Sequence, residues 1–219
     1  MNMKKIIILY MLILTTLVVA SSPVAVVLKV KGTMRVKRAE TESLIYAQKG
    51  TLIYNGDVLN TEEKSLAAIK FVDNGAVMKM RENSLLTVSS EKKAGKLAKK
   101  VSLEIGNIWS KVVSGKGTYR VETGSAVASV KGTKFYVSFY DGLMIVGVEE
   151  GTVGLKNHYG EIDIHDSEAG KVEKNKPPQF TSFSQIDHWS IDEDEEKLLE
   201  IEMKSTQDEK GKLRIKFKK

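Results

Sequence analysis

The chain has 219 residues, of which 42% are hydrophobic and 28% are charged, a composition that excludes wholesale disorder, a collagen-like fibre and a multi-span membrane protein. Its length suits one medium domain with additions, or two small domains. The chain contains no cysteine, so disulfides, thiolate metal sites and thiol nucleophiles are excluded, and its formal net charge is +6.

The first twenty residues have the pattern of a secretory signal. Lys4 and Lys5 precede the uncharged stretch Ile6–Leu14, and Val18-Val19-Ala20 offers small residues before Ser21. The apolar run is short for a membrane span. We therefore expect residues 1–20 to be a cleaved signal peptide and the protein to be periplasmic or secreted. An uncleaved anchor in the inner membrane is the alternative, and this segment would then be the protein's one contact with the membrane.

The region that follows is patterned as β-strands. Apolar residues alternate with other residues over 26–31, 101–105 and 134–139, which gives each segment one apolar face. Asp141-Gly142 lies between two such runs, and this dipeptide favours a two-residue hairpin turn. Asn74-Gly75 predicts a second hairpin in the same way.

Glycine punctuates the strand pattern. Glycines recur every nine or ten residues from Gly132 to Gly170, a spacing that predicts regular turns. The pair Gly-Thr opens an extended segment at five places: Gly32, Gly50, Gly117, Gly132 and Gly151. We predict an all-β fold of about 10–12 strands, either an antiparallel sandwich or a flattened jelly-roll-like barrel. A β-solenoid-like stack is the alternative.

Two segments differ from this body. Glu91–Lys100 contains five lysines and is predicted to be a projecting loop between strands. Lysines of this density could bind a polyanion, although the loop lacks the interleaved aromatic residues that stack on nucleic-acid bases, and a solvated loop is the simpler interpretation.

Lys176-Pro177-Pro178 is expected to close the strand-rich region, since consecutive prolines cannot donate to a ladder. This gives a β domain over residues 21–176 and a C-terminal extension over residues 177–219. The extension contains the acidic run Asp192–Glu196 and two later apolar stretches. We predict a terminal hairpin there, with a short helix over Glu193–Lys204 as the alternative.

Three stretches of the chain resemble the FecR domain, the extracytoplasmic domain named after a bacterial iron-transport regulator. They are Gly56–Thr61 with Ser65–Phe71 and Asp73-Asn74-Gly75, then Gly106–Trp109, and last Val130–Val137 with Val148–Val153. The second resembles the family's glycine-tryptophan turn. Together they cover roughly residues 25–175.

The resemblance implies a link to signalling, because related domains pass an outer-membrane signal to a sigma-factor regulator. Those regulators carry a cytoplasmic anti-sigma segment before a membrane span, whereas five residues precede the apolar run here. A stand-alone envelope version of the domain is therefore expected. Lys131 also stands where the family usually has arginine, which keeps a cation but loses its planar fork.

The residues of these motifs have structural interpretations. Gly132 and Glu149-Glu150-Gly151 fit turns between strands, and the side chain of Asp57 is expected to cap nearby amides. The functional alternative is that Lys131, Glu149 or Asp57 lines a recognition surface.

Residues for catalysis or metal binding are sparse. The three histidines are His158, His165 and His188, and none has the spacing of a metalloprotease helix. Asp163, His165 and Asp166 form the one cluster of hard ligands, on a strand face that is more typical of solvated side chains. We predict no catalytic residue, metal or cofactor; an envelope carbohydrate hydrolase would need a carboxylate pair across a cleft.

Two functions are compatible with these observations. The first is a non-catalytic binding module that presents loops and strand edges to an envelope protein or a cell-wall polymer, with no role for nucleic acid. The second is an extracytoplasmic component of a sigma-factor signalling system, held at the membrane by an uncleaved N-terminal helix. The sequence does not indicate an oligomeric state.

Overall fold

The computed structural model describes residues 21–73, 75–93, 96–115 and 117–185. Those ranges contain seventeen strands and one short 3-10 helix, η1 (Phe183–Gln185). The all-β prediction is confirmed, and the expected 10–12 strands were too few. The predicted signal peptide and the hairpin or helix after residue 186 lie outside the described residues. Among the described residues no helix is long and apolar enough to cross a membrane.

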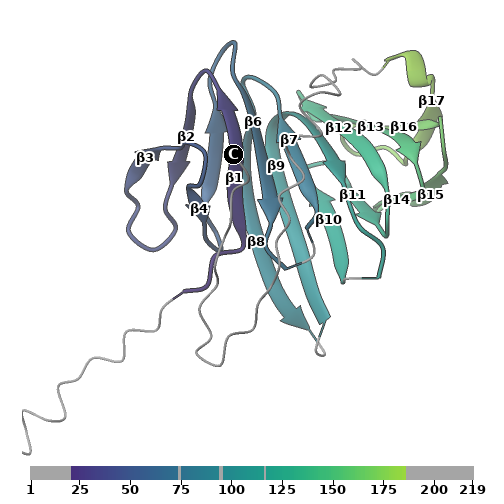
Figure 1. Cartoon of the computed structure of the whole chain (residues 1–219). Coiled ribbons are helices and arrows are strands. Elements are labelled where there is room, and N and C mark those ends of the chain that lie inside the picture. Colours follow the sequence, from purple (N-terminus) through teal and green to yellow (C-terminus); the bar gives the residue numbers. More distant parts are fainter. Residues whose placement is uncertain (1–20, 74, 94–95, 116, 186–219) are drawn as a thin grey trace, which may run out of the picture.

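All the strands are linked by hydrogen-bonded pairing into one sheet, which is folded into two leaves. Leaf A has the order β4-β1-β6-β7-β9-β12-β13-β16-β17, and leaf B has the order β3-β2-β5-β8-β9-β10-β11-β14-β15 (Figure 1). β9 belongs to both leaves and joins them.

The strands of leaf A, apart from β9, are β1 (Ala25–Lys31), β4 (Leu52–Ile53), β6 (Leu66–Phe71), β7 (Val77–Met80), β12 (Lys134–Tyr140), β13 (Leu143–Glu150), β16 (Ala169–Val172) and β17 (Gln179–Thr181). Those of leaf B are β2 (Met34–Lys37), β3 (Leu44–Tyr46), β5 (Val58–Thr61), β8 (Leu85–Lys93), β10 (Thr118–Glu122), β11 (Val127–Val130), β14 (Val153–Asn157) and β15 (Gly160–Ile164). The shared strand is β9 (Lys96–Lys111).

β9 passes from leaf B to leaf A at Gly106. Before this residue β9 pairs with β8 and β10, and from it onward with β7 and β12. Gly106 has φ +116°, and a Cβ added to it would lie 2.5 Å from the Cα of Ser84. Only glycine fits such a bend. The expected glycine-tryptophan turn is therefore corrected: Gly106 bends a continuous strand, and Trp109 follows within it.

The other connections follow the turn chemistry of the sequence. Asp141 and Gly142 both have positive φ, 49° and 78°, and they join β12 to β13 in the predicted hairpin. β6 and β7 form the second predicted hairpin. Most pairings are antiparallel, which fits a sandwich better than a stack of parallel coils; β9 and β10 are parallel, so the sheet is mixed.

The lysine-rich segment is not a projecting loop. β8 and β9 pair through it as far as Lys93 and Lys96. Lys99, in β9, is buried, and its Nζ lies 2.6 Å from Oδ2 of Asp73, beside the β6–β7 hairpin of leaf A. Lys100 pairs with Glu122. These contacts draw the segment into the sheet, because the lysines meet acids that are distant in sequence.

The strands also continue past the two prolines. β17 pairs with β16 at the edge of leaf A, beyond the point where Pro177-Pro178 was expected to end the strand-rich region. Gly170 is not a turn glycine either, since it lies within β16 against the side chains of Ile162 and Ile164. A glycine at this position lets the two leaves pack closely, because a larger side chain would meet the isoleucines of β15.

The core fills the space between the leaves. Tyr119 of leaf B packs edge-to-face on Phe71 and Phe135 of leaf A, with ring centroids 5.7 and 6.2 Å away. Its hydroxyl lies 3.1 Å from Oγ of Ser110 in leaf A. Burial raises the pKa of Tyr119 far above its ordinary value, so the side chain is a neutral link between the leaves.

Candidate functional site

The three residues predicted as candidates lie in different parts of the molecule. Asp57 precedes β5 of leaf B, Lys131 is exposed in the corner between β11 and β12, and Glu149 is near the end of β13 in leaf A. They therefore form no common site.

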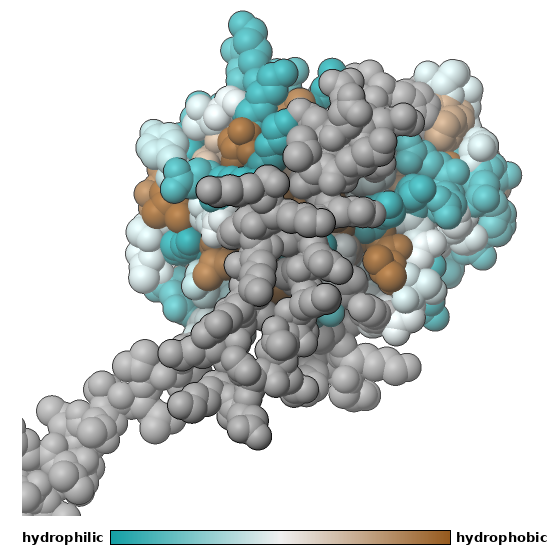
Figure 2. Space-filling model, in the orientation of Figure 1, coloured by the Kyte–Doolittle hydropathy of each residue, from teal (hydrophilic) through white to brown (hydrophobic). Residues whose placement is uncertain are grey.

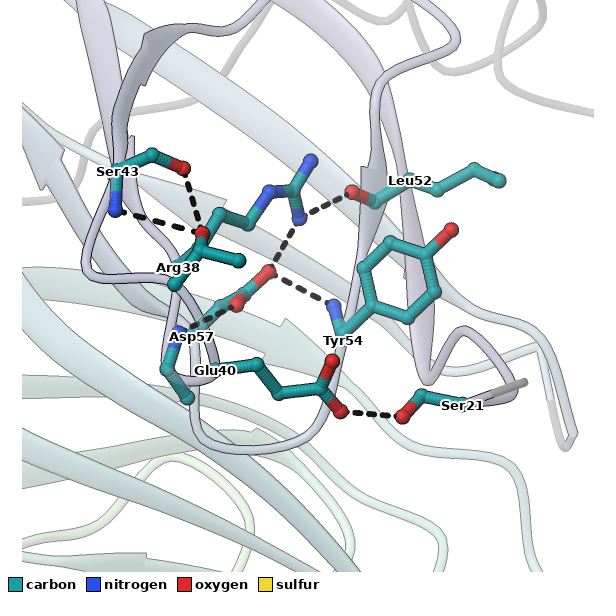
Figure 3. Close-up of polar contacts among 9 residues, drawn as sticks. Ser21, Arg38, Glu40, Ser43, Leu52, Tyr54 and Asp57 are labelled. Atoms are coloured by element: carbon teal, nitrogen blue, oxygen red, sulfur yellow. Dashed lines mark hydrogen bonds and ion pairs between the residues drawn. The ribbon is translucent and has the colours of Figure 1, made fainter. Parts of the chain in front are cut away.

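Asp57 is buried and organises a compact polar cluster (Figure 3). Its Oδ1 accepts from the amide of Ala39 at 3.2 Å, and its Oδ2 accepts from the amide of Tyr54 at 2.9 Å. Nη1 of Arg38 lies 2.5 Å from the same Oδ2 and also donates to the carbonyl of Leu52. The expected amide-capping role of Asp57 is therefore seen directly, together with an ion pair that the sequence did not reveal.

The cluster holds the β2–β3 connection against the β4–β5 turn. The last hydrogen bond between β2 and β3 is donated by the amide of Arg38 to the carbonyl of Ser43. Its guanidinium lies 5.1 Å from the centre of the Tyr54 ring. Because Arg38 and Asp57 pair with each other and also bond to backbone groups, the cluster fixes the geometry of the loops that it joins. The position of β3 is set by this anchor.

β3 is the outermost strand of leaf B. Ile45 packs against the core, whereas the side chains of Leu44 and Tyr46 are 56% and 73% exposed. β3 lies at the left end of the sheet in Figure 1, and Figure 2 shows hydrophobic surface at the same margin. Two large apolar side chains thus lie side by side on an edge strand.

The backbone of β3 is also open. The amides of Arg38 and Ala47 donate to the carbonyls of Ser43 and Met34 across the β2–β3 pair. Antiparallel pairing alternates, so residues 43, 45 and 47 direct their backbone groups toward β2, and Leu44 and Tyr46 direct theirs away. Within the described ranges no strand pairs with that side of β3. This arrangement is a template for a further strand.

The opposite edge of leaf B is different in character. β15 carries Glu161 and Asp163 on its exposed face, and these acids alternate with the inward residues Ile162 and Ile164. Charges on an edge strand discourage pairing with another chain. The contrast makes the β3 edge the candidate binding surface of leaf B.

The three residues that the sequence suggested as metal ligands, Asp163, His165 and Asp166, do not converge on one point in the structure. Asp166 accepts from the amide of Gly151 at 2.6 Å, and Nδ1 of His165 lies 3.2 Å from Oγ1 of Thr152. Asp163 lies on the outward face of its strand, as predicted. No group of three histidine or acidic residues in the described part of the chain is placed to hold a metal ion. His188 lies outside that part.

Glu149 belongs to a polar and aromatic row on the outward face of leaf A. Its carboxylate accepts from Nε1 of Trp109 at 3.1 Å and from the hydroxyl of Tyr136 at 2.6 Å. Lys79 places its ammonium group 4.3 Å from the centre of the Trp109 ring. Burial raises the pKa of Tyr136 far above its ordinary value, and the hydrogen bond and charge of Glu149 raise it further, so the hydroxyl stays a donor.

Neither the open edge of β3 nor the row of side chains around Glu149 was predicted from the sequence. The signal for the row was present in the alternation, which places Lys79, Trp109 and Tyr136 opposite the core positions of their strands. The signal for the edge was absent, because Leu44-Ile45-Tyr46 has the composition of any short strand.

Comparison with known proteins supports the family resemblance. Residues 57–154 match the family described as FecR protein, which confirms the prediction over that range. No curated protein matched the chain.

Among solved structures, the 1.65 Å crystal structure of a candidate anti-sigma factor from Parabacteroides distasonis has a TM-score of 0.50 and 19% identity over 57% of this chain. A second structure with the same description, at 2.50 Å resolution, has a TM-score of 0.49 and the same identity. The chain covers 59% of the length of that protein. At this identity the likeness concerns the fold alone.

Proposed function

We propose that this FecR-domain protein is a non-catalytic binding module of a signalling system outside the cytoplasm, and that it recognises a partner protein by adding one strand of the partner to β3. The FecR match supports the link to signalling, and a solved structure with a similar fold is described as a candidate anti-sigma factor. The apolar segment before Ser21 supports export.

The open edge of β3 is the observation that carries the proposal. An added strand would satisfy the outward backbone groups of Leu44 and Tyr46, and the pairing would supply affinity without any pocket. Its side chains would lie about 5 Å from the two exposed apolar side chains, which would contribute specificity. The Arg38–Asp57 anchor keeps this edge in place before the partner arrives.

A photoreactive amino acid at position 46 of the full chain, in the native host, tests the contact. We expect one discrete adduct with a partner protein, and none from position 159 of the β14–β15 hairpin, where Tyr159 is also exposed. Adducts that are equal at both positions, or absent from position 46, would contradict the proposal.

A proline in the edge strand tests the mode of binding. Leu44→Pro removes an amide that points away from β2, so the strand is expected to remain paired while an incoming strand loses a hydrogen bond. The adduct should then disappear while the circular dichroism of the protein is unchanged. A full-strength adduct in this variant would show that the partner does not pair with β3.

The export step has its own test. We propose that residues 1–20 are removed and that the mature protein begins at Ser21, which lowers the formal net charge from +6 to +4 as Lys4 and Lys5 are lost. Intact-mass measurement of the protein purified from its host should give the mass of residues 21–219. A mass that includes the first twenty residues would support the anchored alternative.

A further inference from the structure

The central part of the outward face of leaf A is buried. Trp109 and Tyr136 are each 6% exposed and Lys79 is 4% exposed. Four outward residues of the neighbouring strands are buried as well: Val26, Leu28, Ala68 and Ala169. We call these seven residues the outer row.

The outer row follows the strand register across the leaf. Ala68 lies opposite Lys79, Lys79 opposite Trp109, and Trp109 opposite Tyr136. Leaf B packs on the other face of these strands, and no strand in the described ranges lies over the outer row. A ring lying on a sheet exposed to water would keep much of its upper surface accessible, so this face has the character of a covered one.

We propose that the cover is the chain's own C-terminal segment, residues 186–219, folded back over the outer row. Thr181 lies opposite Ala169 in the β16–β17 pair, so the chain leaves β17 at one end of the row. Six strand spacings, roughly 29 Å, separate β16 from β1 at the other end. The 34 residues after Gln185 can span that distance several times when extended.

The chemistry of the segment complements that of the face. Outward positions of leaf A carry seven lysines, of which the last two already pair with Glu150 and Glu173: Lys29, Lys31, Lys70, Lys79, Lys111, Lys134 and Lys171. The segment contains the uninterrupted acidic run Asp192–Glu196, followed by the apolar residues Leu198, Leu199 and Ile201. The acids can lie against the lysines while the apolar side chains cover Trp109 and Tyr136.

Two variants of the full chain provide the test through the fluorescence of Trp109. The chain has two tryptophans, so Trp189→Phe leaves Trp109 as the reporter. In this background the acidic run is neutralised to Asn and Gln. The matched control neutralises five exposed acids of leaf B and its loops: Glu42, Glu63, Glu104, Glu161 and Asp163.

Acrylamide quenching of Trp109 should be weak in the Trp189→Phe chain and should rise about threefold when the acidic run is neutralised. Concentrated salt should have the same effect on the Trp189→Phe chain, because salt screens charge pairs at a surface. The leaf B control should be quenched like the parent. Equal quenching in the two neutralised chains, or strong quenching in the parent, would overturn the proposal.

Zero-length carbodiimide coupling of the unaltered protein identifies the occupant without relying on a variant. The expected product is a monomer in which an acid of 192–196 is joined to Lys70, Lys79 or Lys111. Residues 1–20 contain no carboxylate side chain, so they cannot give this product. The same links confined to dimers would assign the face to a second copy, and their absence from monomer and dimer would exclude the acidic run as the cover.

Discussion

At the scale of single residues, the ion pair between Arg38 and the buried Asp57 holds the loop that leads into the exposed edge strand β3. Asp57 accepts two backbone amides and pairs with Arg38, and this cluster carries the loop that leads into β3. A buried carboxylate with these partners cannot be replaced by an amide of the same shape, because an NH2 group offers the partners no acceptor. The cluster is therefore a stability site that serves the binding edge.

Asp57→Asn is expected to lower the free energy of unfolding by about 3 kcal/mol, since it leaves the guanidinium of Arg38 without its counter-charge. Urea denaturation measures the change. The matched control is Asp163→Asn on the exposed face of β15, which should alter stability by less than about 0.5 kcal/mol. Similar losses in the two variants would show that the Asp57 cluster contributes no more than a solvated acid.

At the scale of elements, β9 connects the two leaves through one residue. Gly106 combines a φ of +116° with close backbone contact to Ser84, whereas Gly115 has a φ of +84° and no atom within 4 Å of an added Cβ. Gly115 is thus a position with a positive φ in open space, and Gly106 is one with a positive φ in a crowded place.

Gly115→Ala should lower the free energy of unfolding by about 1 kcal/mol, from backbone strain alone. Gly106→Ala should lower it by about 3 kcal/mol or more, because the new methyl group also collides with Ser84. Equilibrium unfolding in urea gives both values. A Gly106→Ala protein as stable as Gly115→Ala would mean that β9 bends without needing the close contact.

At the scale of the whole molecule, Tyr119 links the leaves through its ring and its hydroxyl. Its pKa is raised by burial, so the unfolded chain releases this proton at lower pH than the folded protein. The stability due to the neutral buried phenol is therefore complete below the ordinary tyrosine pKa of about 10 and declines as the pH rises above it.

Tyr119→Phe should make the loss of stability above pH about 10 shallower by up to about 1.4 kcal/mol per pH unit, the amount expected for one proton. Urea unfolding at a series of alkaline pH values measures the slope. Tyr159→Phe, at an exposed hairpin residue, should leave the slope unchanged. An unaltered slope in Tyr119→Phe would show that this phenol ionises without separating the leaves.

The sequence alone determined the local structure. The alternation in 134–139 and the Asp141-Gly142 turn act between neighbours in the chain, so the strands of the β12–β13 hairpin could be predicted without knowing their surroundings. The capping by Asp57 is local in part, because the amide of Tyr54 is three residues away. The FecR pattern also depends on short motifs, which can be read from the sequence without knowledge of the fold.

The tertiary structure decided which residues meet across the chain. Lys99 belongs to a lysine-rich run in the sequence, yet it is buried because Asp73 of the other leaf lies beside it. Leu44 and Tyr46 form an exposed edge because β2 pairs on one side of β3 and no described strand pairs on the other. Edge position, burial and leaf assignment depend on partners tens of residues away, and periodicity along one strand carries no information about them.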